Sequence, residues 1–378
     1  LDITELASKL SVRYIAIGAL WKMDELFQLS IELYDTKESK VIWSDRWEEN
    51  WENLSLIKRN LSDGLLKALD LKPKMENMFK TVNNQAYEYY LQGKYKMIHR
   101  KNMEDISMAE GLFKKAIELD DNLVEARQFL GFIYLNKEDF DTAFVIYSTI
   151  LKQSEEIGDK KGIGIGLLYL GAVYVSKGDY DKALEYANRA LIIQEEINDI
   201  DGVALSLGGI GFGYLCKGEY NKALEYSKRS IEIKKKFGDQ IILAYEISQM
   251  GSVYYYQGCY KQAVECLEES LGVQKKNEAF AKQSQTILYL YLAYKKLGKQ
   301  YDIEVIHEAV KRREDLKEYS NDFHNNYHYY KLLEKPSYLE SSYNRVQELA
   351  DNLEPDIAAK FLSYPIPKAI VEEWEKVK

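Results

Sequence analysis

The sequence predicts a mostly α-helical protein: a superhelix of repeated helix pairs, preceded by a small α/β domain. Proline, which breaks helices, occurs only 5 times in 378 residues, whereas proteins usually contain about 5% of it. Glycine, aromatic and alanine residues recur every 40 residues through the middle of the chain, and a fixed period of this length is typical of repeat architectures. Near the start, apolar and polar residues alternate instead, which predicts strands.

Residues 1–72 are predicted to form the α/β domain. Apolar or alternating segments predict three strands, at 12–20, 26–34 and 40–47. The connections between them are short, as antiparallel turns require. A helix at about 2–10 precedes the strands, and a second helix at about 52–71 ends before Pro73.

Three short motifs in this domain resemble the latter half of the TolB-like domain of bacterial regulators. They are Gly18 at the end of the first strand, Leu33-Tyr34-Asp35 at the end of the second, and Trp43-Ser44 on the third. The resemblance implies a domain placed between tetratricopeptide repeats and an effector, such as a class III adenylate/guanylate cyclase or a winged-helix DNA-binding domain. The earlier strand and helix of that family are absent, so we expect Leu1 to be an internal residue of a longer protein.

Five residue positions recur with the 40-residue period. They are Gly131, Gly171, Gly211 and Gly251; Tyr134, Tyr174, Tyr214, Tyr254 and Tyr294; Gly178, Gly218, Gly258 and Gly298; Phe140, Tyr180, Tyr220 and Tyr260; and Ala143, Ala183, Ala223 and Ala263. Each unit is predicted to be two helices, for example 165–177 and 180–197, because apolar residues follow helical spacing in both. Gly178 then provides the left-handed residue that ends the first helix.

The segment YLGAVYVSKGDYDKALEYANRAL (169–191) resembles the tetratricopeptide repeat nearly throughout. The usual repeat has 34 residues, and the longer form resembles the repeats of kinesin light chains and of several signalling scaffolds. The resemblance implies about six units over residues 83–316, stacked into a superhelix with a concave surface. Residues 317–378 leave the period and predict short helices broken at Pro355 and at 365–367. We expect this tail to cap the last repeat.

Charge, cysteine content and the length of uncharged segments limit the possible partners and location of the protein. A net charge of −9 disfavours nucleic acid as a partner of this chain. Three cysteines form neither a disulfide framework nor a metal-binding spacing, which favours a reducing, cytoplasmic location. The longest uncharged segments, 162–176 and 202–216, are shorter than the ~20 residues that span a bilayer. No signal peptide is visible at the start.

No catalytic, cofactor or metal site is predicted. Glycine-rich segments at 162–166 and 208–213 resemble nucleotide-binding loops, but both fall inside the first helix of a repeat, where small residues serve helix packing. His324 and His328 have a spacing that could hold a metal, with Asp322 nearby, but their polar neighbours favour an exposed helix instead. We therefore expect this chain not to be an enzyme, although its parent protein could be a nucleotide cyclase.

A partner is expected in the concave groove, on the face of each first helix that is turned away from its second helix. The family resemblance assigns these positions to the groove: Gln128, Phe132, Leu135, Leu168, Ala172, Val175, Leu205, Phe212, Leu215, Tyr245, Ser248, Ser252, Tyr255, Leu288, Leu292 and Lys295. Most are apolar or aromatic, so an amphipathic helix or an extended peptide fits better than the C-terminal carboxylate that chaperone-binding members clamp. The alternative is that these residues contact the chain's own tail or a second copy.

The sequence thus predicts a non-catalytic scaffold in bacterial signalling that binds a protein or peptide segment. The alternative function is the regulatory C-terminal half of a class III cyclase, or of a transcriptional regulator, whose effector domain lies upstream. No motif identifies the partner itself.

Overall fold

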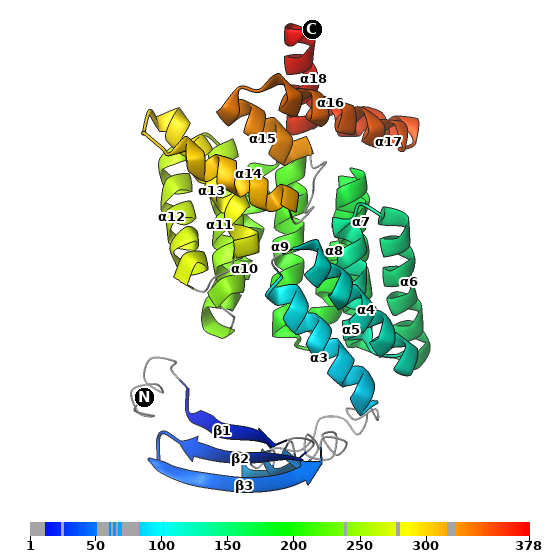
Figure 1. Ribbon diagram of the computed structural model, residues 1–378, viewed down its shortest axis with the longest axis vertical. Coiled ribbons are helices and arrows are strands. Elements are labelled where there is room, and N and C mark those ends of the chain that lie inside the picture. The colour runs from blue at the N-terminus through cyan, green and yellow to red at the C-terminus, as the bar shows by residue number, and fades with distance from the viewer. Residues whose placement is uncertain are drawn as a thin grey trace. The chain divides into compact units, whose positions relative to one another are not determined.

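The computed structural model describes residues 12–23, 26–50, 60–61, 63–65, 67–69, 83–100, 102–237, 240–276, 280–315 and 323–378. The chain forms two compact units, Leu1–Tyr95 with Gly111–Leu123, and Lys96–Glu110 with Val124–Lys378. Two helices, α3 (Asn84–Ile98) and α4 (Met103–Leu119), contribute to both. The predicted fold class, mostly helical with a small N-terminal sheet, is confirmed (Figure 1).

The first unit contains a three-stranded antiparallel sheet, as the alternating segments predict. Its strands are β1 (Tyr14–Met23), β2 (Leu26–Asp35) and β3 (Lys40–Asn50), in the order β1-β2-β3. After β2, the buried carboxylate of Asp35 accepts hydrogen bonds from the guanidinium of Arg13 (2.9 Å) and from the backbone N–H of Lys37 (2.8 Å). The bond from Arg13 in particular holds the pKa of Asp35 below its usual value, so the carboxylate stays charged and fixes the turn.

The helices expected beside the sheet are described only in part. The one expected at about 2–10 lies outside the described residues. Within the expected 52–71 helix, residues 60–61, 63–65 and 67–68 are described and are helical, and Gly64 lies against the indole of Trp43 on β3. The unit continues with α3 (Asn84–Ile98), where Gly93 lies against the ring of Phe113 on α4.

The second unit is a solenoid of helix pairs followed by a tail of shorter helices. The pairs are α5 (Val124–Asn136) with α6 (Phe140–Ile157), α7 (Lys160–Lys177) with α8 (Tyr180–Glu196), α9 (Ile200–Lys217) with α10 (Tyr220–Phe237), α11 (Gln240–Tyr256) with α12 (Tyr260–Lys276), and α13 (Phe280–Leu297) with α14 (Ile303–Asp315). The tail comprises α15 (Phe323–Leu333), α16 (Pro336–Asp351), α17 (Pro355–Ser363) and α18 (Pro365–Val377). Three tail prolines stand at the first position of a helix. The backbone N–H that proline lacks would have no hydrogen-bond acceptor within the helix at this position. None of the described helices is long and apolar enough to cross a membrane.

The turn within each pair follows from the repeated residues. α7 ends at Gly178, whose φ of 86° lies in the left-handed region. The side chain of Asp179 then accepts a hydrogen bond from the backbone N–H of Lys182 (3.1 Å) and starts α8. Gly218, Gly258 and Gly298 repeat this left-handed conformation. The predicted role of the second glycine position is therefore confirmed.

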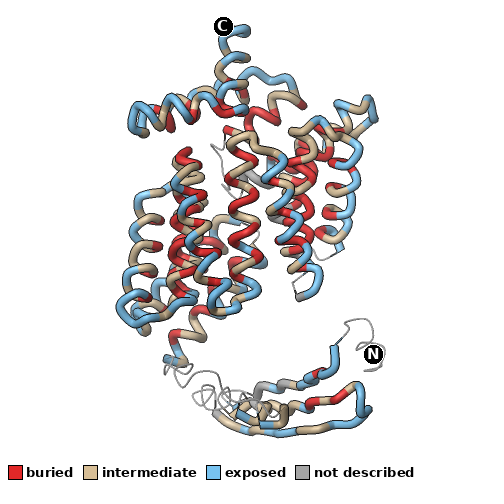
Figure 2. The backbone as a smooth tube through the Cα atoms, turned by 180° about the vertical axis from the view of Figure 1, so that it is seen from behind, coloured by how far each residue is buried: buried red, intermediate tan, exposed pale blue. Residues whose placement is uncertain are grey.

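The first helices line the inner side of the solenoid. Successive first helices contact one another, α5 with α7, α7 with α9, α9 with α11 and α11 with α13. Among the described residues, successive second helices have no comparable contacts, so they must lie farther apart on the outer side. Buried residues gather where the helices pack (Figure 2).

Close packing of α6 against α7 requires glycine at Gly166. A Cβ atom there would lie 2.9 Å from the backbone N of Leu151 on α6. We expect Gly166→Ala to lower the free energy of unfolding by about 1–3 kcal/mol, because the two helices must move apart. Gly272→Ala on α12 is the matched control, since a Cβ at Gly272 meets nothing within 4 Å. That control should gain about 0.5–1 kcal/mol from helix propensity. Chemical denaturation measures both, and equal stability of the two variants would contradict the packing argument.

Candidate interaction surface

The tail helices lie across one end of the repeat helices (Figure 1). They form a buried apolar cluster with Tyr180 and Cys216 of the repeats. Val175 on α7 and Phe212 on α9, both predicted to line the groove, pack against this cluster. This cluster contains residues of the chain's own tail, which the sequence offered as the alternative occupant of these positions.

The predicted groove positions differ widely in exposure. Half-buried are Gln128, Phe132, Leu168, Ala172, Val175, Phe212, Tyr245 and Tyr255; exposed are Leu205 and Lys295; buried are Leu135, Leu215, Ser248, Ser252, Leu288 and Leu292. The buried positions pack inside the solenoid, where a partner has no access to them. For example, the hydroxyl of Ser248 on α11 shares a hydrogen bond of 2.8 Å with that of Thr286 on α13.

In the last pair, α15 covers the predicted positions. Leu288 and Leu292 lie in one buried cluster with side chains of α15. Lys295 donates a hydrogen bond to the backbone oxygen of Lys331 (2.7 Å) and pairs with the carboxylate of Glu334 (2.9 Å). The cation that the sequence places nearest the groove is thus held by the tail.

The tail also contacts the turns of three successive repeats. The contacts are Arg345 with Glu138, Phe361 with Gly178, and Pro365 with Gly218. Phe361 is fully buried and lies in the space that a Cβ on Gly178 would occupy. Lys360 pairs with Asp181, whose pKa is lowered because Lys217 and Lys360 outweigh its partial burial. The aperiodic tail is therefore fixed by residues from the periodic part of the chain.

His328 on α15 joins the tail to the repeats by hydrogen bonds. Its Nδ1 contacts the backbone oxygen of His324, which only accepts, so Nδ1 carries the proton. Nε2 therefore accepts from the hydroxyl of Tyr256 (2.9 Å), and the oxygen of Tyr256 accepts from the hydroxyl of Tyr289 (3.2 Å). Burial lowers the pKa of His328 to about 3, so the ring is neutral near pH 7. The bonds connect α11, α13 and α15.

The interpretation of α15 as an exposed polar helix was wrong. Asn325, Asn326 and His328 are all buried, because α15 packs against both α13 and α16. Both ring nitrogens of His328 already have hydrogen-bond partners. In the part of the chain that the structure describes, no group of three or more His, Cys, Asp or Glu side chains could hold a metal. Asp322, the third residue considered from the sequence, lies outside that part.

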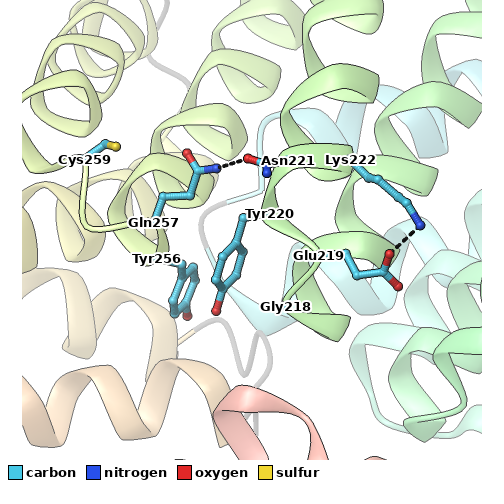
Figure 3. Close-up of a pocket in the computed structure, with 8 residues that line it drawn as sticks. All are labelled: Gly218, Glu219, Tyr220, Asn221, Lys222, Tyr256, Gln257 and Cys259. Atoms are coloured by element: carbon cyan, nitrogen blue, oxygen red, sulfur yellow. Dashed lines mark hydrogen bonds and ion pairs between the residues drawn. The ribbon is translucent and has the colours of Figure 1, made fainter.

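A pocket of about 720 Å³ lies between the turn after α9 and the turn after α11 (Figure 3). It is lined by Gly218, Glu219, Tyr220, Asn221, Lys222, Tyr256, Gln257 and Cys259. The rings of Tyr220 and Tyr256 stack with centroids 6.0 Å apart. Sequence reasoning missed this pocket because it considered only the inner face. The 40-residue period could have indicated the pocket, because its residues follow the residues around Gly178 and Gly218 by 40 positions.

The part of the inner face that the tail leaves open lies on α7 and α9. Leu205 is 38% exposed and Leu168 is half-buried. A Cβ at Gly209 would meet only Leu168, at 3.5 Å, so there is room above the backbone here. We call Leu168, Ala172, Leu205 and Gly209 the open inner face. These four residues are apolar and uncharged. The carboxylate of Glu246 on α11 lies beside the neighbouring Gly208.

Comparison with known proteins identifies the repeats. Residues 122–196 and 162–236 match the family model of the tetratricopeptide repeat. The match shows tetratricopeptide repeats in residues 122–236, which confirms that part of the sequence prediction. The resemblance of residues 1–72 to the TolB-like domain is not confirmed and stays a hypothesis. A search of curated proteins gives no match.

Several solved structures have a similar fold at low sequence identity. A Rap protein complexed with Competence and Sporulation Factor has a TM-score of 0.53 and 14% identity, over 86% of this chain and 96% of that chain. The apo form of RapI has a TM-score of 0.48 and 15% identity, over 77% and 99%. A putative kinesin light chain from Podosopora anserina has a TM-score of 0.39 and 15% identity, over 57% and 98%. At these identities the likeness concerns the fold alone.

Proposed function

We propose that this chain is a non-catalytic interaction scaffold whose open inner face binds a peptide or helix of a partner protein. One observation carries the proposal: Leu205, a large apolar side chain on an inner helix, is 38% exposed. Inner positions of a solenoid are close to neighbouring helices, so an exposed leucine there offers apolar area that a partner can bury. Bacterial signalling is the setting that we propose for this activity.

The composition of the open inner face supports an apolar segment as its ligand. Leu168 and Leu205 provide apolar side chains, and Gly209 leaves space beside Leu168. A partner helix with apolar residues at i, i+3 or i+4, and i+7 suits such a surface, because its anchors would bury the apolar side chains of Leu168 and Leu205. The Rap protein of similar fold, crystallised with Competence and Sporulation Factor, supports binding as a use of this architecture.

Substitution of Leu205 by glutamate tests the proposal. Peptides selected from a random display library on the wild-type chain should lose at least about tenfold in affinity for Leu205→Glu, which corresponds to ~1.4 kcal/mol. Ile192→Glu is the matched control, because Ile192 is 57% exposed on the outer helix α8. Isothermal titration calorimetry on both variants gives the comparison. Selected peptides that bind Leu205→Glu and Ile192→Glu equally well would contradict the proposal.

The alternative function, the regulatory part of a cyclase or of a transcriptional regulator, rests on the N-terminal residues. The three antiparallel strands agree in number with those that the TolB-like resemblance implies. A cyclase or winged-helix domain in the same reading frame would favour this alternative, and the scaffold would then serve that effector. In either case we propose the same division of the chain, into 1–72, 83–316 and 317–378.

A further inference from the structure

The tail uses equivalent places in successive repeats. We define a turn site as the turn within one repeat together with the same turn of the next repeat. In the first turn site, Arg345 pairs with Glu138 (3.1 Å) and its guanidinium lies over the ring of Phe140. In the second, Phe361 and Tyr364 lie on the ring of Tyr180, with centroid distances of 6.2 and 5.0 Å.

A polar pair joins the two turns in each site. Lys177 pairs with Asp141 (2.8 Å) in the first turn site, and Lys217 pairs with Asp181 (2.7 Å) in the second. Lys360 of the tail adds a second cation to Asp181. In the third turn site the equivalent residues are uncharged, and the amide of Gln257 donates to the side-chain oxygen of Asn221 (2.9 Å).

The open pocket in Figure 3 is this third turn site. Gly218, Tyr220 and Asn221 follow Gly178, Tyr180 and Asp181 by 40 positions, and Tyr256, Gln257 and Cys259 follow Cys216, Lys217 and Glu219 in the same way. One difference is that Tyr256 replaces the small Cys216, and its ring stacks on Tyr220. The third site therefore has a two-ring surface of its own, with Pro365 of the tail at its Gly218 edge and His328 of α15 beside the ring of Tyr256.

We propose that the third turn site binds a segment of a partner protein, with an aromatic side chain against Tyr220 and Tyr256 and an uncharged residue beside Asn221 and Gln257. The tail itself shows which chemistry the turns accept, because Phe361 of α17 and Tyr364, which follows that helix, lie against the ring of Tyr180. A tail from a second copy fits less well, since its Lys360 would meet Asn221 in place of a carboxylate. The nearby carboxylate of Glu219 is already paired with Lys222 (2.6 Å).

Synthetic peptides based on α17 test this proposal on the full chain. The probes are the peptide of residues 354–368 and its Lys360→Gln version, each with a fluorescent label for anisotropy. On the wild-type chain, the Lys360→Gln peptide should bind at least as tightly as the parent peptide, and its Phe361→Ala derivative at least about tenfold more weakly. On the Asn221→Asp chain the order should reverse, with the parent tighter by about twofold to fivefold, the range that an exposed ion pair supplies.

Matched variants show whether binding occurs at the third turn site. Tyr220→Leu should weaken binding of the Lys360→Gln peptide about tenfold. Tyr260→Leu, which changes the equivalent tyrosine of the next repeat, should not weaken it.

No binding of the Lys360→Gln peptide would overturn the proposal. Tighter binding of the parent to the wild-type chain would also overturn it, because the peptide would then be replacing the tail at Asp181. Self-association of the chain that Tyr220→Leu abolishes would make a second copy the occupant. Leu205→Glu should leave all these values unchanged, which separates this site from the open inner face.

Discussion

Phe361→Ala is expected to release α17 and α18 from the repeats while α5 to α13 stay folded. Phe361 is fully buried. Its ring packs edge-on against Tyr180 and Phe323, with centroids at 6.2 and 5.9 Å. Removing a buried phenylalanine costs about 3–5 kcal/mol. α17 has only 9 residues, too few to hold a helix in water without packing. The loss should therefore fall on the tail rather than on the whole solenoid.

Hydrogen exchange of the amides in 355–377 measures this release directly. Those amides should lose most of their protection in Phe361→Ala, and the amides of α7 and α9 should keep theirs. Lys360→Ala is the control, because an exposed ion pair such as Lys360 with Asp181 contributes at most about 1 kcal/mol. Full protection of 355–377 in Phe361→Ala would show that other contacts suffice to hold the tail.

The periodic part of the fold could be predicted from the sequence because one local rule repeats. Gly178 and its equivalents must be left-handed, and Asp179 must cap the next helix, whatever else the chain does. An apolar run at 12–20 and alternation at 26–34 and 40–47 predicted the three strands for a similar reason, since both are local properties of the sequence. Neither prediction needed information about distant contacts.

The tail could not be placed in this way, because its contacts cross long stretches of chain. Phe361 meets Gly178, and nothing in an aperiodic segment indicates which turn it will reach. The burial of Leu288, Leu292 and His328 depends on the same docking. Several groove positions predicted on α7 and α9 are half-buried, but which of them a partner can reach depends on where the tail packs. Binding of a partner to the remaining positions stays a prediction.

A consequence for function follows from where the tail lies. It packs against the ends of α7 and α9 at Val175 and Phe212 and leaves Leu168 and Leu205 nearer their starts. A partner longer than the open inner face would therefore meet the tail. Variants that loosen the tail, such as Phe361→Ala, should lengthen the apolar surface available on these two helices.

Acid is expected to loosen the tail through His328. The pKa of the buried ring is lowered to about 3, mainly by burial, from an ordinary value of 6.5. A lowered pKa means that the neutral ring contributes its full stability above pH 6.5 and that this contribution is lost as the pH falls toward 3. At pH 5 the loss amounts to about 2 kcal/mol, from 1.36 kcal/mol for each pH unit below 6.5. The charged groups nearby, His324 and Lys331, act in the same direction, because each disfavours a second positive charge.

Comparison of wild type with His328→Gln isolates this effect. Glutamine does not titrate, so His328→Gln should lose about 2 kcal/mol less than wild type between pH 7 and pH 5 in chemical denaturation. His307→Gln, on α14 where 42% of the His307 side chain is exposed, is the control for replacing a histidine by glutamine. Equal pH dependence of wild type and His328→Gln would mean that His328 can be protonated in place. The hydrogen bond between Tyr256 and Nε2 would then not require a neutral ring, and the apolar clusters and ion pairs would suffice to hold the tail.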